Sequence, residues 1–152
     1  MTIEPITGNE PIEDIQSPFA ALVQFYAAFN GQNLAGMRSN WIQNDEAAMS
    51  NPLGGIKRGW ADIETTYQKI FFGPAIVTVQ FYDYTITSTE NMFVAVGRER
   101  GSLEIGDTRI NLLIRTSRIY RREQSLWKQV HHHGSMDDPT LLTQYQNIVL
   151  KA

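Results

Sequence analysis

The chain has 152 residues, 42% of them hydrophobic and 19% charged, which fits one globular domain with a single core. A net charge of −3 and a pI near 5.6 exclude the basic surface that nucleic acids and anionic membranes attract. Since cysteine is absent, a disulfide scaffold, a thiolate metal site and a cysteine nucleophile are excluded too. We expect a cytoplasmic protein with no nucleic-acid or membrane partner, because no apolar run resembles a signal peptide or a membrane span.

The N-terminal segment differs in composition from the rest of the chain. Residues 1–16 combine Pro5, Gly8 and Pro11 with acidic side chains, which is typical of a loose arm or a short extra helix rather than of core. We therefore expect an N-terminal arm over residues 1–16 and a single domain over residues 17–152.

Three helices are predicted in the first half of that domain. The first begins at Ser17-Pro18, where serine can cap free amides and proline lacks only an N–H that the first turn leaves unpaired, and it ends at Gly31. Each helix has an apolar face at helical spacing. The three faces consist of Leu22, Phe25, Tyr26 and Phe29; of Leu34, Met37 and Trp41; and of Ile63, Tyr67, Ile70 and Phe71.

From Ile76 onward the hydrophobic period changes to two. Four β-branched and aromatic runs near 76–88, 91–103, 108–121 and 126–136 are joined by short polar connections, which predicts an antiparallel meander. A further short helix is predicted after Pro139. Helices followed by a meander indicate an α+β fold, in which a curved sheet packs on about three helices and leaves a cavity beneath it.

Two segments resemble a known family. The stretch "DEAAMSNPLGGIKRG" between the helices and the ending "YRREQSLWKQVHHHGS" resemble SnoaL-like proteins of the nuclear transport factor 2-like superfamily. The ending is also similar to the His-x-His-x-Ser strand of the calcium/calmodulin-dependent kinase II association domain. The resemblance covers roughly residues 18–136 and implies a cystatin-like α+β cone with a pocket. It does not imply one function, because this fold hosts isomerases, cyclases, hydratases, binding modules and assembly modules.

The resemblance also implies that the chain is not a ketosteroid isomerase. Asn51, before Pro52-Leu53-Gly54, stands where those enzymes carry the aspartate base, and an amide cannot accept a proton at neutral pH. Phe25 stands at the place of the tyrosine that donates to the oxyanion. Thr116 falls near the place of their protonated aspartate.

Two arginines are candidate ligand anchors. Arg98 and Arg118 occupy the positions of pocket-facing arginines in the kinase association domain, and the resemblance implies that both point inward. Strand alternation gives partial support, because the inner row beside each arginine would be mostly apolar. The rows would be Met92, Val94 and Val96 for Arg98, and Leu112, Ile114 and Thr116 for Arg118. Two interpretations stay open. One is a carboxylate ligand, and the other is a salt bridge with Asp83 or Glu99 or simple exposure at the rim.

The other candidates are histidines, a carboxylate and pocket-wall residues. In a regular strand His131 and His133 share one face with Gln129, and His132 lies on the other. His131 or His133 could donate to a ligand or carry a proton, as could Asp45 near the expected pocket mouth. We expect no metal, because no third ligand accompanies the two histidines, and no cofactor. The pocket-wall candidates are Tyr26, Trp41, Asn51, Tyr67 and Thr116.

These observations predict a homodimeric small-molecule-binding domain whose pocket holds an anionic or carbonyl-bearing ligand. The dimer is expected because a wide, partly apolar sheet hides its outer face, with Leu113, Ile119 and Val130 on it by alternation. The first alternative is an enzyme of the cyclase, hydratase or isomerase type that uses a histidine or Asp45 as proton carrier. The second is an oligomerisation module without a ligand.

Overall fold

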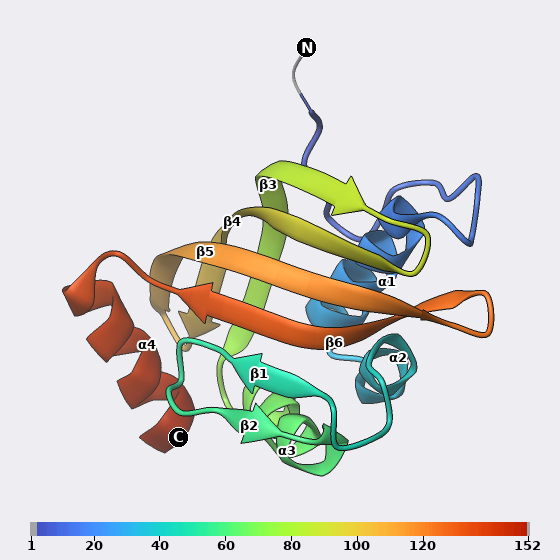
Figure 1. Ribbon diagram of the computed structural model, residues 1–152. Helices are drawn as coiled ribbons and strands as arrows, with labels where there is room; N and C mark the ends of the chain where they lie inside the picture. The colour runs from blue at the N-terminus through green and yellow to red at the C-terminus, as the bar shows by residue number, and fades with distance from the viewer. Residues whose placement is uncertain (1–2, 152) are drawn as a thin grey trace.

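The computed structural model describes residues 3–151 and shows one curved sheet with helices packed against its inner face (Figure 1). The helices are α1 (Pro18–Asn30), α2 (Leu34–Asn40), α3 (Trp60–Phe72) and α4 (Pro139–Lys151). The strands are β1 (Ala48–Ser50), β2 (Lys57–Arg58), β3 (Ile76–Ser88), β4 (Met92–Ile105), β5 (Thr108–Glu123) and β6 (Leu126–Ser135). The predicted α+β fold, with a curved and mostly antiparallel sheet and a C-terminal helix, is confirmed.

The sheet has the order β2-β1-β6-β5-β4-β3, and its only parallel pair within residues 3–151 is β1 with β6. Two of the three long hairpins, β4–β5 and β5–β6, turn through two residues each, so that Ile105 pairs with Thr108 and Glu123 pairs with Leu126. A two-residue turn fixes the register of both strands, and the register decides which side chains share a face.

The edge strand β3 bends sharply in its second half. The register between β3 and β4 shifts between Tyr82 and Thr85, and Asp83 within the shift has a left-handed φ of 49°. An extra residue of this kind bends a strand and increases its twist. Figure 1 shows the consequence, because β3 rises behind the sheet and then folds over to run beside β4.

The core lies between the sheet and helices α1 and α3. Ser17 caps α1 as predicted, since its hydroxyl accepts a hydrogen bond from the Ala20 amide at 3.0 Å. The inward faces of the helices are aromatic, and the rings of Phe25, Phe29 and Tyr67 meet in stacked and edge-on pairs. Such pairs stabilise a core beyond the area that they bury.

Part of the N-terminal arm belongs to the core, in contrast to the expectation of a loose segment. Ile6 is fully buried and exchanges two backbone hydrogen bonds with Phe81 of β3, at 2.8 and 2.9 Å. The Glu10 carboxylate accepts hydrogen bonds from the backbone amides of Thr7 and Gly8. The arm therefore covers the edge of β3 at its bend, where unpaired backbone groups would otherwise be free to pair with another chain.

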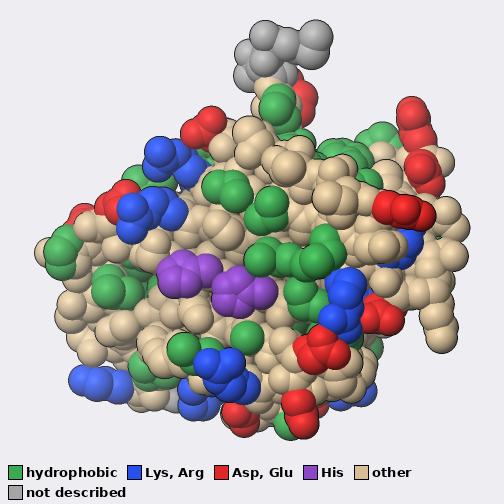
Figure 2. All heavy atoms as spheres, in the orientation of Figure 1, with side chains coloured by type: hydrophobic (Ala, Val, Ile, Leu, Met, Phe, Trp, Pro, Cys, Tyr) green, Lys and Arg blue, Asp and Glu red, His purple; other side chains and the backbone are tan. Residues whose placement is uncertain are grey.

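The outer face of the sheet carries exposed apolar side chains, among them Val96 and Leu113. Figure 2 shows hydrophobic side chains on this face beside a central pair of histidines. Ile119 and Val130 are half-buried there. No helix within residues 3–151 is long and apolar enough to cross a membrane.

Candidate functional site

A buried ion pair lies on the inner face of the sheet, where β4 and β5 run side by side. The Arg118 Nη2 atom is 3.0 Å from Glu99 Oε2, and the two side chains are 3% and 6% exposed. Glu99 also accepts hydrogen bonds from the Tyr26 hydroxyl at 2.6 Å and the Thr116 hydroxyl at 3.0 Å. Both carboxylate oxygens are therefore paired, as a charge removed from water requires.

A chain of amides continues this network toward α2. Arg118 Nη1 donates to Gln129 Oε1 at 2.9 Å, and Gln129 Nε2 donates to Asn40 Oδ1 at 3.1 Å. The same Asn40 oxygen accepts from the Tyr120 hydroxyl at 2.8 Å, and its amide group donates to the Ala21 carbonyl. Every side chain in this hydrogen-bond series is buried and paired. The network therefore fixes the Arg118 guanidinium in one position.

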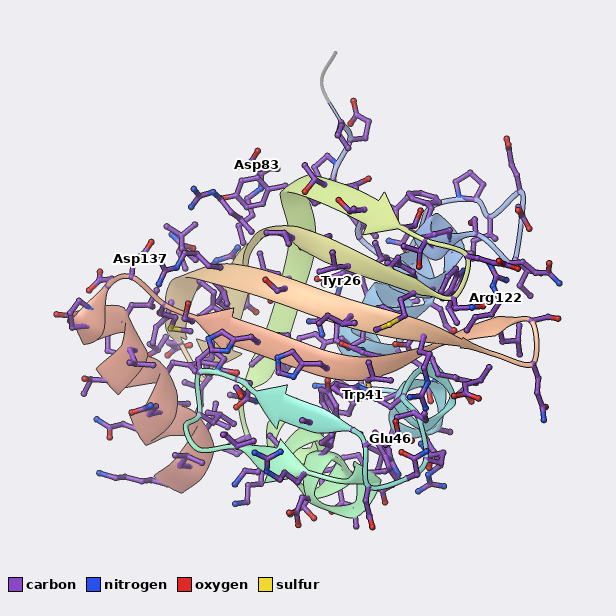
Figure 3. All side chains as sticks on the ribbon, viewed as in Figure 1. Tyr26, Trp41, Glu46, Asp83, Arg122 and Asp137 are labelled. Carbon is purple, nitrogen blue, oxygen red and sulfur yellow. The ribbon has the colours of Figure 1, made fainter. Side chains whose placement is uncertain are left out.

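Aromatic rings enclose the guanidinium. Arg118 Cζ lies 3.6 Å from the ring centre of Phe25, a cation–π contact. Burial alone would lower the pKa of Arg118, but its attraction to Tyr26 and Glu99 outweighs that effect and places this pKa above its usual value. Burial, followed by the charge of Glu99, raises the pKa of Tyr26. At neutral pH Arg118 is therefore charged and Tyr26 is protonated, and Figure 3 shows Tyr26 behind the sheet on α1.

A cavity of about 40 Å³ adjoins the ion pair. Its polar wall comes from Glu99, Arg118, His132, Asn51 and Tyr67. The remaining wall is apolar or aromatic and consists of Phe25, Phe29, Met49, Pro52, Ile70, Val77, Val79, Ile114 and Tyr145. A small, mostly apolar space with a few polar groups in its wall is the usual form of a small-molecule site.

His132 is the histidine that faces this cavity, and a β-bulge places it there. Ile119 pairs with His131 while Tyr120 pairs with Gln129, so Val130 is an extra residue in β6. The extra residue reverses the alternation beyond it, which puts His132 on the inner face with Gln129. The prediction that His131 and His133 share the face of Gln129 is therefore wrong. His131 is half-buried with Nδ1 3.0 Å from the Ala48 carbonyl oxygen, and His133 is exposed.

Neither ring nitrogen of His132 has a hydrogen-bond partner among residues 3–151, although the residue is only 6% exposed. Burial lowers the pKa of His132 well below its usual value, and the positive charge of Arg118 lowers it further. The imidazole is therefore neutral at pH 7, with one donor and one acceptor that the protein leaves unpaired. Unpaired buried polar groups are rare and costly, so this one requires an explanation.

The structure brings only some of the predicted ligand residues together. Arg118, Asn51 and Tyr67 line the cavity. Tyr26 and Thr116 lie one layer behind it as partners of Glu99. Trp41, also behind the wall, donates from its indole nitrogen to the Tyr67 hydroxyl at 3.2 Å. Burial raises the pKa of Tyr67 to about 12, so its hydroxyl stays protonated.

Other candidates lie outside the cavity. Arg98 is more than half exposed on the outer face and pairs with Asp83 at 3.2 Å, contrary to the expectation that it points inward. Figure 3 shows Asp83 at the bend of β3, far from Tyr26. Asp45 is exposed in the turn before β1. Both arginines therefore form salt bridges, Arg98 with Asp83 and Arg118 with Glu99.

The two-residue turn between β4 and β5 is a sequence feature from which the outward position of Arg98 could have been predicted. Gly106 and Asp107 form the two-residue turn, and counting back from the closing pair puts Ala95 opposite Arg118 and Arg98 opposite Arg115. Directly opposed residues share a face, so Arg98 and Arg118 cannot both point inward. No comparable signal marks His132, because nothing in the sequence announces the extra residue in β6.

Two further features bear on the choice of site. No group of three or more metal-binding side chains is assembled within residues 3–151. A wider groove of about 440 Å³ lies between α4 and the ends of β4 and β5, but it opens on the surface. Arg98 and Arg115 in its wall are already paired with Asp83 and Asp137. The cavity beside the ion pair is the better candidate, because only there does a buried polar side chain lack partners among the described residues.

The fold and cavity are those of a pocket-forming α+β domain, and a family model described as "SnoaL-like domain" matches residues 19–139. The chain belongs to this SnoaL-like family and has the fold of the nuclear transport factor 2-like superfamily. None of the curated proteins matches it.

Solved structures of the same fold come from several bacteria. A Thiobacillus denitrificans protein described as a calcium/calmodulin-dependent protein kinase type II association domain is 28% identical, with a TM-score of 0.70 and coverage of 85% of this chain and 100% of that chain. A Streptomyces avermitilis protein described as a dehydratase of the NTF2-like family is 17% identical, with a TM-score of 0.70 and coverage of 82% and 97%. A ketosteroid isomerase-like protein from Erwinia carotovora atroseptica is 13% identical, with a TM-score of 0.67 and coverage of 84% and 98%. The last two show the fold alone.

Proposed function

We propose that this domain binds a small, neutral, carbonyl-bearing molecule in the cavity beside His132. The observation that carries the proposal is the pair of unpaired nitrogens on His132, in the wall of an otherwise mostly apolar cavity. A carbonyl oxygen of the ligand would accept from the imidazole N–H, and its carbon skeleton would contact Phe29, Ile70 and Val77. The gain in hydrogen bonding is large because the buried nitrogen has lost its water.

A neutral ligand fits the charges of the cavity better than an anion does. The predicted anion site needed two inward arginines, whereas Arg98 lies outside and Arg118 is neutralised by Glu99. An anion in the cavity would lie near the Glu99 carboxylate with no unpaired cation to offset the repulsion. His132 does not supply that cation, because its lowered pKa keeps it neutral.

The test compares isosteric neutral and anionic probes. Acetamide and isobutyramide should raise the thermal midpoint at pH 7.5, whereas acetate and isobutyrate should not. A probe at a hundred times its dissociation constant stabilises by about 2.7 kcal/mol. His132→Phe should abolish the shift, while His133→Phe, at the exposed neighbour, should keep it. Larger shifts with the carboxylates, or an equal response from His132→Phe, would contradict the proposal.

An enzymatic function is the second candidate, and the neutral imidazole favours it. An unprotonated His132 can accept a proton from a bound substrate, and the buried Tyr67 hydroxyl on the cavity wall can donate a hydrogen bond. We infer that any cyclase, hydratase or isomerase activity would use His132, in place of the earlier candidates His131, His133 and Asp45.

We also propose that the domain is a homodimer. Val96 and Leu113 are 49% and 59% exposed on the outer sheet face. The ion pairs Arg98–Asp83 and Arg115–Asp137 place both signs of charge around them, so this face is complementary to a second copy of itself. The name of the Thiobacillus denitrificans relative as an association domain supports self-association. Assembly and ligand binding use opposite faces of the sheet and are compatible.

A further inference from the structure

We propose that α4 is a movable cover over the cavity and that Tyr145 on this helix sets the size of the molecule that enters. The consequence for ligand size rests on the proposed binding function. The movement itself can be measured without any ligand.

The closed cavity is too small for most ligands. Its volume is about 40 Å³, whereas small-molecule pockets usually measure about 300–1,000 Å³. One water-sized group needs roughly 10–15 Å³, so the closed cavity has room for only about three such groups. A molecule with more heavy atoms can bind only if part of the wall moves.

Most of the wall is held too firmly to move. The sheet side carries Glu99 and Arg118. Their hydrogen bonds reach α1 through Tyr26, and they reach Asn40 of α2 through Gln129. Moving either helix would break buried polar contacts, and a buried donor or acceptor without a partner is costly. The α3 side is packed on α1, because Phe29 makes edge-on aromatic contacts with Tyr67 and Phe71 of α3.

Helix α4 is held differently. It buries one apolar stripe, formed by Leu141, Tyr145 and Val149, and presents its other faces to solvent. Within residues 3–151, one side-chain hydrogen bond joins it to the rest of the domain, from Gln146 Nε2 to the Pro52 carbonyl at 2.9 Å. The family match ends at residue 139, where α4 begins. Figure 1 shows α4 beside the β1–β2 end of the sheet.

The segment that receives this hydrogen bond is built to change conformation. It follows β1, contributes Asn51 and Pro52 to the cavity wall, and continues into Gly54 and Gly55. These two glycines have φ values of 101° and 71°, and a side chain at either would meet open space. The open space around these two glycines leaves the part of the turn after Leu53 free to adjust when α4 moves.

Tyr145 occupies the space that a ligand would need. It lies in the cavity wall and is 4% exposed, and burial raises its pKa, so the phenol is uncharged. When α4 moves outward, this ring leaves the wall and the cavity gains about the volume of a phenol ring. The side chain at position 145 therefore limits ligand size while the cover is closed.

The absence of native cysteine makes the opening directly measurable. Val77→Cys places a thiol in the cavity wall, and Val23→Cys places a matched thiol in buried α1 away from the cavity. Under native conditions iodoacetamide should modify the Val77→Cys protein at least tenfold faster. Adding Gln146→Ala should speed this reaction by roughly two- to tenfold, as loss of one hydrogen bond implies. Gln144→Ala, on the exposed side of α4, should not change it.

If iodoacetamide modifies the two thiols at equal rates, α4 is not a movable cover, because the cavity then opens only on global unfolding. A second experiment links the cover to binding. Pro52→Cys/Gln146→Cys joined by a short bismaleimide should bind isobutyramide at least tenfold more weakly than the unjoined protein. If both bind it equally, the cover is wrong and the binding function stands. If Val77→Cys labels fast but isobutyramide does not bind, the cover stands and the binding function fails.

The size limit has its own measurement. Tyr145→Ala should lower the ratio of the isobutyramide dissociation constant to that of acetamide at least fivefold. Tyr145→Leu, which disturbs the core less, should lower it by a smaller factor. An unchanged ratio in a folded variant would show that Tyr145 does not limit ligand size.

Discussion

Removing the charge of Glu99 should destabilise the domain far more than removing an exposed charge from the same strand. Glu99→Gln keeps the shape of the side chain but leaves Arg118 charged in a nearly dry environment. It also replaces one of the two oxygens that accept from Tyr26, Thr116 and Arg118 with a donor. Two effects therefore add, an uncompensated buried charge and a donor that faces other donors.

Breaking one side of a buried ion pair typically costs about 3–5 kcal/mol. For a domain of this length, 1 kcal/mol lowers the thermal midpoint by about 2–4 °C, so a fall of roughly 6–20 °C is expected. Glu104→Gln provides the matched control, because Glu104 also lies on β4 and pairs with Arg109 at 2.8 Å, with side chains 49% and 64% exposed. An exposed pair of this kind contributes about 0–1 kcal/mol.

Urea unfolding followed by tryptophan fluorescence measures both variants. A loss for Glu99→Gln no larger than that for Glu104→Gln would refute the reasoning, since the buried pair would then behave as if it were hydrated. Adding Arg118→Met to Glu99→Gln should recover part of the lost stability, because the uncompensated charge is removed. No recovery would show that the hydrogen bonds of Arg118, and not its charge, dominate.

Three further outcomes are expected. Because His132 is neutral when folded and binds a proton when unfolded below about pH 6.5, stability should fall from that pH downward by at most about 1.4 kcal/mol per pH unit. Urea titrations from pH 7.5 to 5 should show a shallower fall for His132→Phe but not for His133→Phe, and identical slopes would contradict the lowered pKa. Light scattering after size exclusion should give a dimer at micromolar concentration that Leu113→Glu converts to monomer; a wild-type monomer would reject the proposed dimer. With Asn51 in place of the base, a Δ5-3-ketosteroid should isomerise at the buffer rate, and turnover lost on changing Asn51 would overturn that alignment.

The sequence determined the elements and their order, because these depend on local chemistry. The Ser17 cap, the helical spacing of Phe25 and Phe29, and the change to a period of two at Ile76 each report the backbone conformation of their own neighbourhood. The likeness of the two quoted segments to SnoaL-like proteins added the family. The resemblance to the kinase association domain placed Arg118 on the inner face, and the regular alternation of β5 from Leu112 onward supported this placement.

Only the tertiary structure decided which side chains meet in the cavity. Arg98 lies outside because pairing with β5 fixes the face of β4, and an apolar Val96 beside it is also compatible with an exposed face that a partner covers. His132 lies inside because Val130 is an extra residue, and a bulge shifts every later side chain to the opposite face. Alternation along one strand is a local property, whereas the face that it presents depends on its neighbour.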